Sequence, residues 1–380
     1  MELPPLVRTI TEKIAKNKKG LVVVLVVVVV VVVALALSSR HGHGPSNGPP
    51  TGPTGPTGPP NGPSNGPPTG PNGPHNGPTD LHDEESRIFV SVASYRDKLC
   101  GATLASMFAM ARNPARVFAG VYEQNADACE SCLSSELKWR SNVRIVTVGA
   151  EQAKGPCAAR YRCSLLLRDE PVFLQIDSHT EFARDWDVGA VRMLREVPGA
   201  AHGAVVISTY PVNCDAGWEK SGIPVIDKAK YGGGWVTFEA TIRGTVDGAV
   251  VPSRQIGGGF MLCVSDVVRR VPFDPGLDGV FNNEEALYTA RLFTHGIDVV
   301  APQRNLVCHK YFYDGHRVPW NDRPDWNKGT RGNERVESLL LGKNEDQFGA
   351  YGMGTTRSLS DFWAHVNIDY ANKTVGAWPH

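Results

Sequence analysis

The sequence predicts an α/β fold whose central sheet is mostly parallel and carries helices on both faces. Three observations predict it. Short apolar runs rich in β-branched and aromatic residues alternate with segments whose apolar residues recur at helical spacing. The links between these segments are short, which favours parallel strands joined by crossover helices. Residues 87–380 have ordinary hydrophobic content and suffice for one large domain.

The elements follow in a regular order from residue 88. The first strand, Ile88–Tyr95, leads into a helix over Leu99–Ala111, which stops before Asn113-Pro114. The same reasoning predicts strands at 117–122, 143–148, 172–176 and 204–208, and helices at 157–167 and 185–197. Ligands of such sheets bind beyond the carboxyl ends of the strands. The letters SYRD, not a glycine-rich phosphate loop, follow the first strand, which argues against a dinucleotide-dependent dehydrogenase and a P-loop enzyme.

The first 37 residues are typical of a membrane anchor. Gly20–Leu37 contains 18 residues without a polar side chain, and a helix of this length, roughly 27 Å, spans the hydrocarbon of a bilayer. Basic residues lie mainly before this segment, at positions 8, 13, 16, 18 and 19. We therefore expect a cytosolic tail (1–19), a signal anchor (20–37) and a luminal or extracytosolic remainder, as in a single-pass type II membrane protein of the ER, Golgi or cell surface. The alternative is a cleaved signal peptide, because Ala34-Leu35-Ala36 resembles a cleavage site.

Residues 38–86 form a Gly/Pro-rich segment that we expect to be a disordered stalk. Its glycines are spaced by four and by three residues, whereas a collagen helix requires glycine at every third position. The chain as a whole carries 39 basic and 39 acidic residues, so it lacks the basic excess typical of nucleic-acid binders. All eight cysteines follow residue 86, and we expect some of them to pair in an oxidising compartment.

An unusual pair of polar residues ends the predicted strand at 172–176. In FLQIDSHTEF (173–182), Asp177 and His179 project to the same side of an extended chain, with Ser178 turned away. One carboxylate oxygen and one imidazole nitrogen supply half of an octahedral site for a divalent ion such as Mn²⁺. The alternative is a capping aspartate next to an incidental surface histidine. The residues alone leave both interpretations open.

Five motifs occur in an order found in one enzyme family. They are FVSVASYRD (89–97), KGPCAARY (154–161), FLQIDSHTEF (173–182), FNNEEALYTARLFTHGIDVVAP (281–302) and VCHKY (307–311). Over about residues 87–320 the chain resembles the polypeptide α-N-acetylglucosaminyltransferases, which transfer GlcNAc from UDP-GlcNAc to hydroxyproline or threonine of proteins.

The resemblance implies a GT-A-type glycosyltransferase fold, with residues 87–380 as the catalytic domain and a D-x-H motif in place of the usual D-x-D. It implies that Asp177, His179 and His309 hold Mn²⁺ or another divalent cation that bridges the diphosphate of a UDP-sugar. The cation offsets the negative charge that develops on the departing UDP. The family is retaining, which implies a retaining transfer here.

Further candidates flank these ligands. Glu284 and Glu285 follow Asn282-Asn283, which is typical of a helix N-cap, and the two acidic residues could merely complement the helix dipole. The resemblance implies a catalytic role for one of them, as a base, a nucleophile or a residue that positions the sugar. The predicted donor-binding residues are Arg96 and Asp97 after the first strand, Lys154 and Arg160 around Gly155-Pro156, and Gly258 and Gly259 in a glycine run.

The sequence thus predicts a membrane-anchored, metal-dependent glycosyltransferase. Its expected partners are a UDP-sugar, a protein or glycan acceptor and the membrane, and no nucleic acid. Two other classes remain open. One is a surface-displayed sugar-binding or structural protein with a degenerate transferase fold, and the other is a metal-dependent hydrolase.

Overall fold

The computed structural model describes residues 81–82, 85–244, 250–343 and 347–376. These residues lie in the second of two compact units, Gly70–His380. The predicted tail (1–19), the predicted anchor (20–37) and most of the predicted stalk (38–86) lie outside them. Within the described part of the chain, no helix combines the length and the apolar character needed to cross a bilayer.

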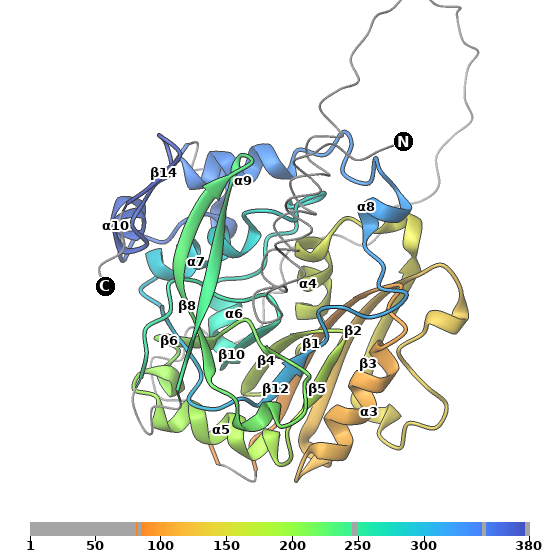
Figure 1. Ribbon diagram of the computed structural model, residues 1–380. Helices are drawn as coiled ribbons and strands as arrows, with labels where there is room; N and C mark the ends of the chain where they lie inside the picture. The colour runs from red at the N-terminus through yellow and green to blue at the C-terminus, as the bar shows by residue number, and fades with distance from the viewer. Residues whose placement is uncertain (1–80, 83–84, 245–249, 344–346, 377–380) are drawn as a thin grey trace, which may run out of the picture. The chain divides into compact units, whose positions relative to one another are not determined.

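A seven-stranded sheet forms the centre of this unit, in the order β11-β6-β10-β4-β1-β2-β3 (Figure 1). Parallel pairs join β1 to β2 and β4, β2 to β3, and β6 to β11. Only β10 among the described strands of this sheet runs antiparallel, against β4 and β6. The prediction of a mostly parallel α/β sheet is confirmed. The strands are β1 Ile88–Tyr95, β2 Val117–Asn125, β3 Val143–Gly149, β4 Val172–Asp177, β6 Val205–Ser208, β10 Phe260–Val264 and β11 Asp298–Val300.

Helices cover both faces of the sheet (Figure 1). Helices α3 (Cys100–Met110) and α5 (Trp186–Glu196) pack together on one face, where Trp186 Nε1 donates to the Met107 carbonyl at 2.9 Å. Helix α4 (Pro156–Ser164) lies on the opposite face, against β1 and β2. The other helices are α6 Ser265–Arg270, α7 Glu284–Thr294, α8 Pro319–Asp322, α9 Gly332–Leu340 and α10 Leu359–His365.

Three smaller sheets surround the central one. The first has the order β5-β12-β7, the second is the long hairpin of β8 and β9, and the third pairs β13 with β14. Their strands are β5 Thr180–Phe182, β7 Val212–Asn213, β8 Ile223–Gly232, β9 Trp235–Arg243, β12 Val307–His309, β13 Ile368–Asp369 and β14 Thr374–Val375.

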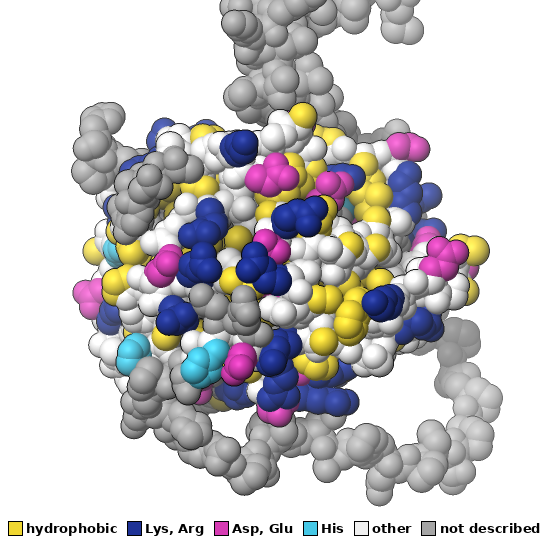
Figure 2. Space-filling model, turned by 90° about the horizontal axis from the view of Figure 1, so that it is seen from below, with side chains coloured by type: hydrophobic (Ala, Val, Ile, Leu, Met, Phe, Trp, Pro, Cys, Tyr) yellow, Lys and Arg dark blue, Asp and Glu magenta, His cyan; other side chains and the backbone are white. Residues whose placement is uncertain are grey.

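The apolar core lies between the central sheet and its helices and includes the stacked rings of Phe89 and Phe173. Two disulfides, Cys100–Cys132 and Cys214–Cys308, join loops to this framework. The other four cysteines are free, and of these only Cys129 is exposed. On the face shown in Figure 2, Lys and Arg side chains lie among Asp and Glu side chains.

Candidate metal and donor site

The D-x-H motif lies at the carboxyl end of β4. Asp177 ends this strand, the chain turns at Ser178 and His179, and β5 begins at Thr180. Because the backbone turns here, the expectation that Ser178 faces away was wrong. Its hydroxyl and the His179 ring both reach the same carboxylate, that of Asp97.

A distant strand brings His309 to this turn. Strand β12 pairs antiparallel with β5, so that His309 lies opposite Thr180. The Nε2 atom of His309 is 3.1 Å from Asp177 Oδ2, and the His179 and His309 ring centroids are 4.4 Å apart. One ligand atom from each of these side chains lies within 4.8 Å of the others. The structure thus brings together all three predicted metal ligands.

The chemistry of these three side chains fits a divalent cation. Two atoms that bind one ion at right angles, each over about 2.1 Å, lie roughly 3 Å from one another. The distance between His309 Nε2 and Asp177 Oδ2 is close to this value. Burial would raise the pKa of Asp177, but the hydrogen bond from His309 and the positive charge of Arg160 outweigh it and lower that pKa. Asp177 is therefore ionised, and a carboxylate with two imidazoles suits Mn²⁺.

Asp97 holds the second histidine of the group. It is 4% exposed and accepts hydrogen bonds from the Leu99 amide (2.8 Å), Ser178 Oγ (2.6 Å) and His179 Nδ1 (2.7 Å). Burial alone would raise the pKa of Asp97, but the bond to His179 lowers it. When Nδ1 of His179 carries the shared hydrogen, Nε2 keeps its lone pair for an ion, as in other carboxylate–histidine–metal arrangements. The structure places Asp97 behind His179.

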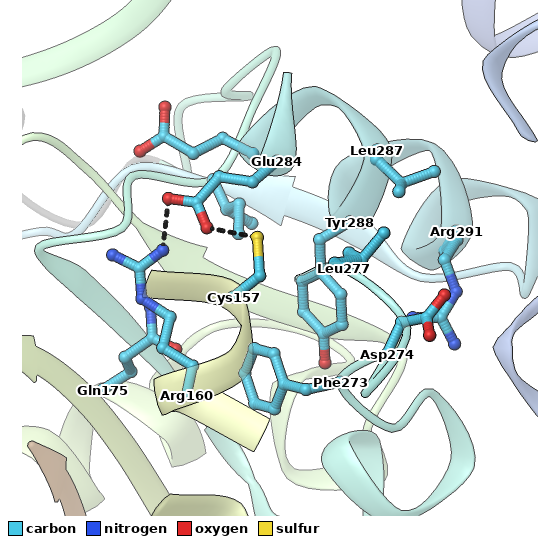
Figure 3. A pocket seen from close by; sticks show the side chains of 12 residues that line it. Cys157, Arg160, Gln175, Phe273, Asp274, Leu277, Glu284, Leu287, Tyr288 and Arg291 are labelled. Carbon is cyan, nitrogen blue, oxygen red and sulfur yellow. Dashed lines mark hydrogen bonds and ion pairs between the residues drawn. The ribbon is translucent and has the colours of Figure 1, made fainter. Parts of the chain in front are cut away.

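An ion pair between two largely buried side chains connects the three candidate metal ligands to helix α7. Arg160 on α4 lies 2.6 Å from Glu284 Oε1 and 3.7 Å from Asp177 Oδ1. Cys157 donates its thiol hydrogen to the other Glu284 oxygen at 2.9 Å, and Figure 3 shows Glu284 between these two partners. Burial and the Glu284 charge raise the pKa of Cys157, which keeps the thiol protonated. Both Glu284 oxygens are thus engaged, and the Arg160 guanidinium lies between two carboxylates.

Glu285 faces a different set of partners. It accepts hydrogen bonds from Tyr210 OH at 2.7 Å, Gln255 Nε2 at 3.0 Å and the Gly258 amide at 2.6 Å. Burial, followed by the neighbouring Glu284 charge, raises the pKa of Glu285 to about 7. A carboxyl group with this pKa exists in both protonation states near neutral pH.

The helix start before these two glutamates differs from the prediction. Asn283 occupies the N-cap position of α7, but its backbone is left-handed (φ 60°) and its side chain does not cap the helix. Its Oδ1 atom accepts a hydrogen bond from the Val236 amide at 2.8 Å instead. Asn283 therefore ties the β8–β9 hairpin to the start of α7.

The glycine run before β10 approaches the group closely. A Cβ atom on Gly259 would lie 3.0 Å from Asp177 Oδ2 and 3.2 Å from Pro211 Cδ, and a Cβ atom on Gly258 would lie 2.5 Å from Arg160 Nη2. The absence of side chains lets the backbone pass beside the candidate ligands. Two predicted donor-binding residues thus lie next to the predicted metal site.

Two other predicted donor-binding cations have acidic partners. Arg96 pairs with Glu130 at 2.9 Å and with Asp322 at 2.8 Å, which fastens two loops over the end of β1. Lys154 pairs with Asp278 at 2.6 Å, and its side chain is 60% exposed. Neither forms a described ion pair with the Asp177 group.

A pocket at the carboxyl ends of β2 and β3 was missed from the sequence. Glu123, Asn125, Thr147 and Gln152 are among its lining residues. Asn125 is only 6% exposed, and both polar atoms of its side chain lack hydrogen-bond partners among the described residues. A buried amide without partners is costly, and neither polar atom of this side chain reaches solvent or another described polar group. Its position at the end of a predicted strand was the only available signal.

The sequence analysis also missed an aromatic loop beside the candidate metal site. Tyr311 lies with its ring centroid 4.1 Å from that of His309, and Tyr313 and His316 each lie 5.4 Å from His179. The loop has no periodic pattern, and the only signal for it was that its first residue, Tyr311, ends the VCHKY motif. A second cluster, Glu181 with Cys214 and Cys308, also has metal-ligand geometry, but its two cysteines are joined in a disulfide.

The fold and these side chains define an α/β protein with a candidate divalent-cation site at the carboxyl edge of its sheet. A family model described as Glycosyltransferase (GlcNAc) matches residues 87–139 and 135–372, more than half of the chain. The chain therefore belongs to this glycosyltransferase family. A comparison with curated proteins found no match.

Three solved structures are similar to the chain. The first is GalNAc-T7 with UDP, GalNAc and Mn²⁺ (14% identity, TM-score 0.47, covering 74% of this chain and 55% of that one). The second is the Pyrobaculum calidifontis mannosyltransferase PcManGT with GDP-Man and Mn²⁺ (13%, 0.44, 77% and 73%). The third is S. aureus TarS 1–349 with UDP-GlcNAc (11%, 0.46, 76% and 72%). This chain spans little more than half the length of the first.

Proposed function

We propose that this protein transfers a sugar, GlcNAc from UDP-GlcNAc, with retention, to a hydroxyl of a polypeptide or glycan acceptor. The observation that carries the proposal is the convergence of Asp177, His179 and His309 at the carboxyl edge of the sheet, in a chain of the glycosyltransferase family. Of the similar solved structures, that of GalNAc-T7 contains UDP and Mn²⁺, and that of TarS contains UDP-GlcNAc.

In this proposal each residue of the group has a distinct role. Asp177, His179 and His309 would hold Mn²⁺, and the ion would offset the negative charge of the UDP diphosphate. Asp97 orients His179 through its hydrogen bond to Nδ1. Arg160 places a largely buried positive charge beside Asp177, where it favours the same diphosphate.

The pocket at β2 and β3 is our proposed subsite for the uracil base. Asn125 lines this pocket and carries one donor and one acceptor that no described residue satisfies, and a base would reach them once the side chain turns toward the pocket. Uracil presents an N–H beside a carbonyl oxygen, so one amide side chain can pair with both. Arg96 and Lys154 then act at the edges of the donor site through the loops that they fasten.

The two glutamates have different proposed roles. Arg160 and Cys157 engage the two oxygens of Glu284 beside the candidate metal site, a suitable place to position the donor sugar. Glu285, with a pKa of about 7, is able to exchange a proton near neutral pH. We therefore propose Glu284 as the sugar-positioning residue and Glu285 as the group that takes part in proton transfer.

We further propose that the catalytic domain lies in the lumen of the secretory pathway or at the cell surface, behind the anchor at 20–37 and the stalk at 38–86. The two disulfides support this, because such bonds persist in oxidising compartments.

A direct test is a screen of the purified full chain against a panel of UDP-sugars with Mn²⁺, in parallel with Asp177→Ala and His179→Ala. The proposal expects Mn²⁺-dependent release of UDP that both substitutions abolish. Activity that survives both substitutions contradicts the metal assignment, and activity only with another UDP-sugar contradicts the choice of GlcNAc. Equal rates with and without Mn²⁺ point to a sugar-binding protein, and turnover without any nucleotide sugar points to a hydrolase.

A further inference from the structure

The strand that carries His309 belongs to a very small sheet. Strand β12 has three residues, its partner β5 has three and its partner β7 has two. The segment after β12 is largely exposed, and Phe312 within it is 84% exposed. Backbone pairing in so short a sheet gives His309 little support compared with Asp177, which ends a central strand of the main sheet.

A covalent bond lies directly beside His309. Cys308 is fully buried and is joined to Cys214, which follows β7. The bond connects residues 94 positions apart and fastens β12 to the chain next to β7. A cross-link over so long a loop removes more entropy from the unfolded chain than one over a short loop.

The other two ligands do not depend on this bond. Asp177 belongs to β4, which is paired on both sides by β1 and β10. His179 is held by Asp97 at 2.7 Å. A loss of the cross-link would therefore loosen His309 selectively.

We infer that the Cys214–Cys308 disulfide is a positioning device for the metal site, which makes cation binding dependent on an oxidising environment. The inference rests on the proposed function, because it takes His309 as a ligand. A dithiol reductant attacks the sulfur of Cys214, which is the more accessible of the two. The Sγ–Sγ bond breaks, two electrons and two protons pass to the protein, both cysteines become thiols, and the reductant leaves as a cyclic disulfide. His309 then loses its fixed position and the site loses its third ligand.

The test compares two double variants of the full chain, purified in detergent. Cys214→Ala with Cys308→Ala removes the bond beside His309, and alanine avoids placing a hydroxyl in a buried position. Cys100→Ala with Cys132→Ala removes the other disulfide and is the matched control. Free Mn²⁺ is measured by its electron paramagnetic resonance signal during titration without nucleotide, and far-UV circular dichroism checks the fold.

We expect Mn²⁺ to bind at least about tenfold more weakly to the Cys214/Cys308 variant, and to the control with an affinity within twofold of the original chain. Treatment of the control variant with dithiothreitol should reproduce the weakening, because it breaks the remaining disulfide. His309→Ala is the reference for complete loss of the ligand.

The outcomes separate the inference from the proposed function. If His309→Ala binds Mn²⁺ as tightly as the original chain, His309 is not a ligand and the metal assignment of the proposed function fails. If His309→Ala weakens binding while the folded Cys214/Cys308 variant and the reduced control do not, the proposed function stands and the disulfide inference is overturned. If the Cys214/Cys308 variant does not fold, the control variant treated with dithiothreitol takes its place, provided that its circular dichroism spectrum shows that it is folded. Its Mn²⁺ affinity then decides whether the disulfide inference stands.

Discussion

Replacing Asp97 by asparagine should weaken Mn²⁺ binding without changing any of the three proposed metal ligands. Asp97 Oδ1 accepts the Leu99 amide, and Oδ2 accepts both Ser178 and His179. In Asp97→Asn the amide oxygen must stay opposite the Leu99 N–H, so the NH₂ group faces His179. The Nδ1 atom then has to accept a hydrogen bond, and the ring hydrogen moves to Nε2, the atom that would bind the ion.

The size of the effect follows from burial and charge. Asp97 is 4% exposed, so solvent does not replace the lost interaction. A hydrogen bond to a charged group contributes about 1.5–3 kcal/mol, which corresponds to roughly 10- to 150-fold in affinity. Ser178→Ala is the matched control, because it removes one hydrogen bond to Asp97 and leaves the bond to His179. We expect the control to bind Mn²⁺ within about threefold of the original chain.

Two titrations decide the outcome, one of Mn²⁺ followed by electron paramagnetic resonance and one of UDP without metal followed by calorimetry. The structure predicts weaker Mn²⁺ binding and unchanged UDP binding for Asp97→Asn. The sequence alone suggested that Asp97 contacts the nucleotide, which predicts weaker UDP binding and unchanged Mn²⁺ binding. A folded Asp97→Asn protein with Mn²⁺ affinity within twofold of the original would refute the reasoning about His179.

Two further predictions use the same site. The pKa of Glu285 is raised from 4.5 to about 7 in the folded protein, so the folded state binds the Glu285 proton more tightly than the unfolded chain does. The free energy of unfolding therefore falls as the pH rises through that range, by roughly 3 kcal/mol from this group. In urea unfolding at pH 5 and pH 8, the free energy of unfolding of Glu285→Gln should fall less between the two pH values than that of the original chain. An equal fall in both proteins would contradict the raised pKa of Glu285. A Cβ on Gly259 would lie 3.0 Å from Asp177 Oδ2, whereas a Cβ on Gly232 meets nothing within 4 Å. In the Mn²⁺ titration followed by electron paramagnetic resonance, Gly259→Ala should bind Mn²⁺ about tenfold more weakly, and Gly232→Ala should bind it as the original chain does.

Much of this protein was readable from local patterns. The alternation of strand and helix segments predicted the mostly parallel sheet, because hydrophobic periodicity reports local structure directly. The position of Asp177 at the end of a strand placed it at the edge where ligands bind. The order of five motifs predicted the reaction class, and the family match agrees with it.

The contacts between distant residues were decided by the tertiary structure. His309 meets Asp177 across 132 positions because β12 pairs with β5, and pairing register depends on the whole fold. The role of Asp97 behind His179, and of Asn283 in holding a hairpin, depends on partners 82 and 47 positions away. The unpartnered amide of Asn125 became visible only when the burial of every neighbour was known. The sequence by itself determined which side chains were available for chemistry, and the packing of the sheets decided which of them meet, because hydrogen-bond partners far apart in the chain are chosen by the fold.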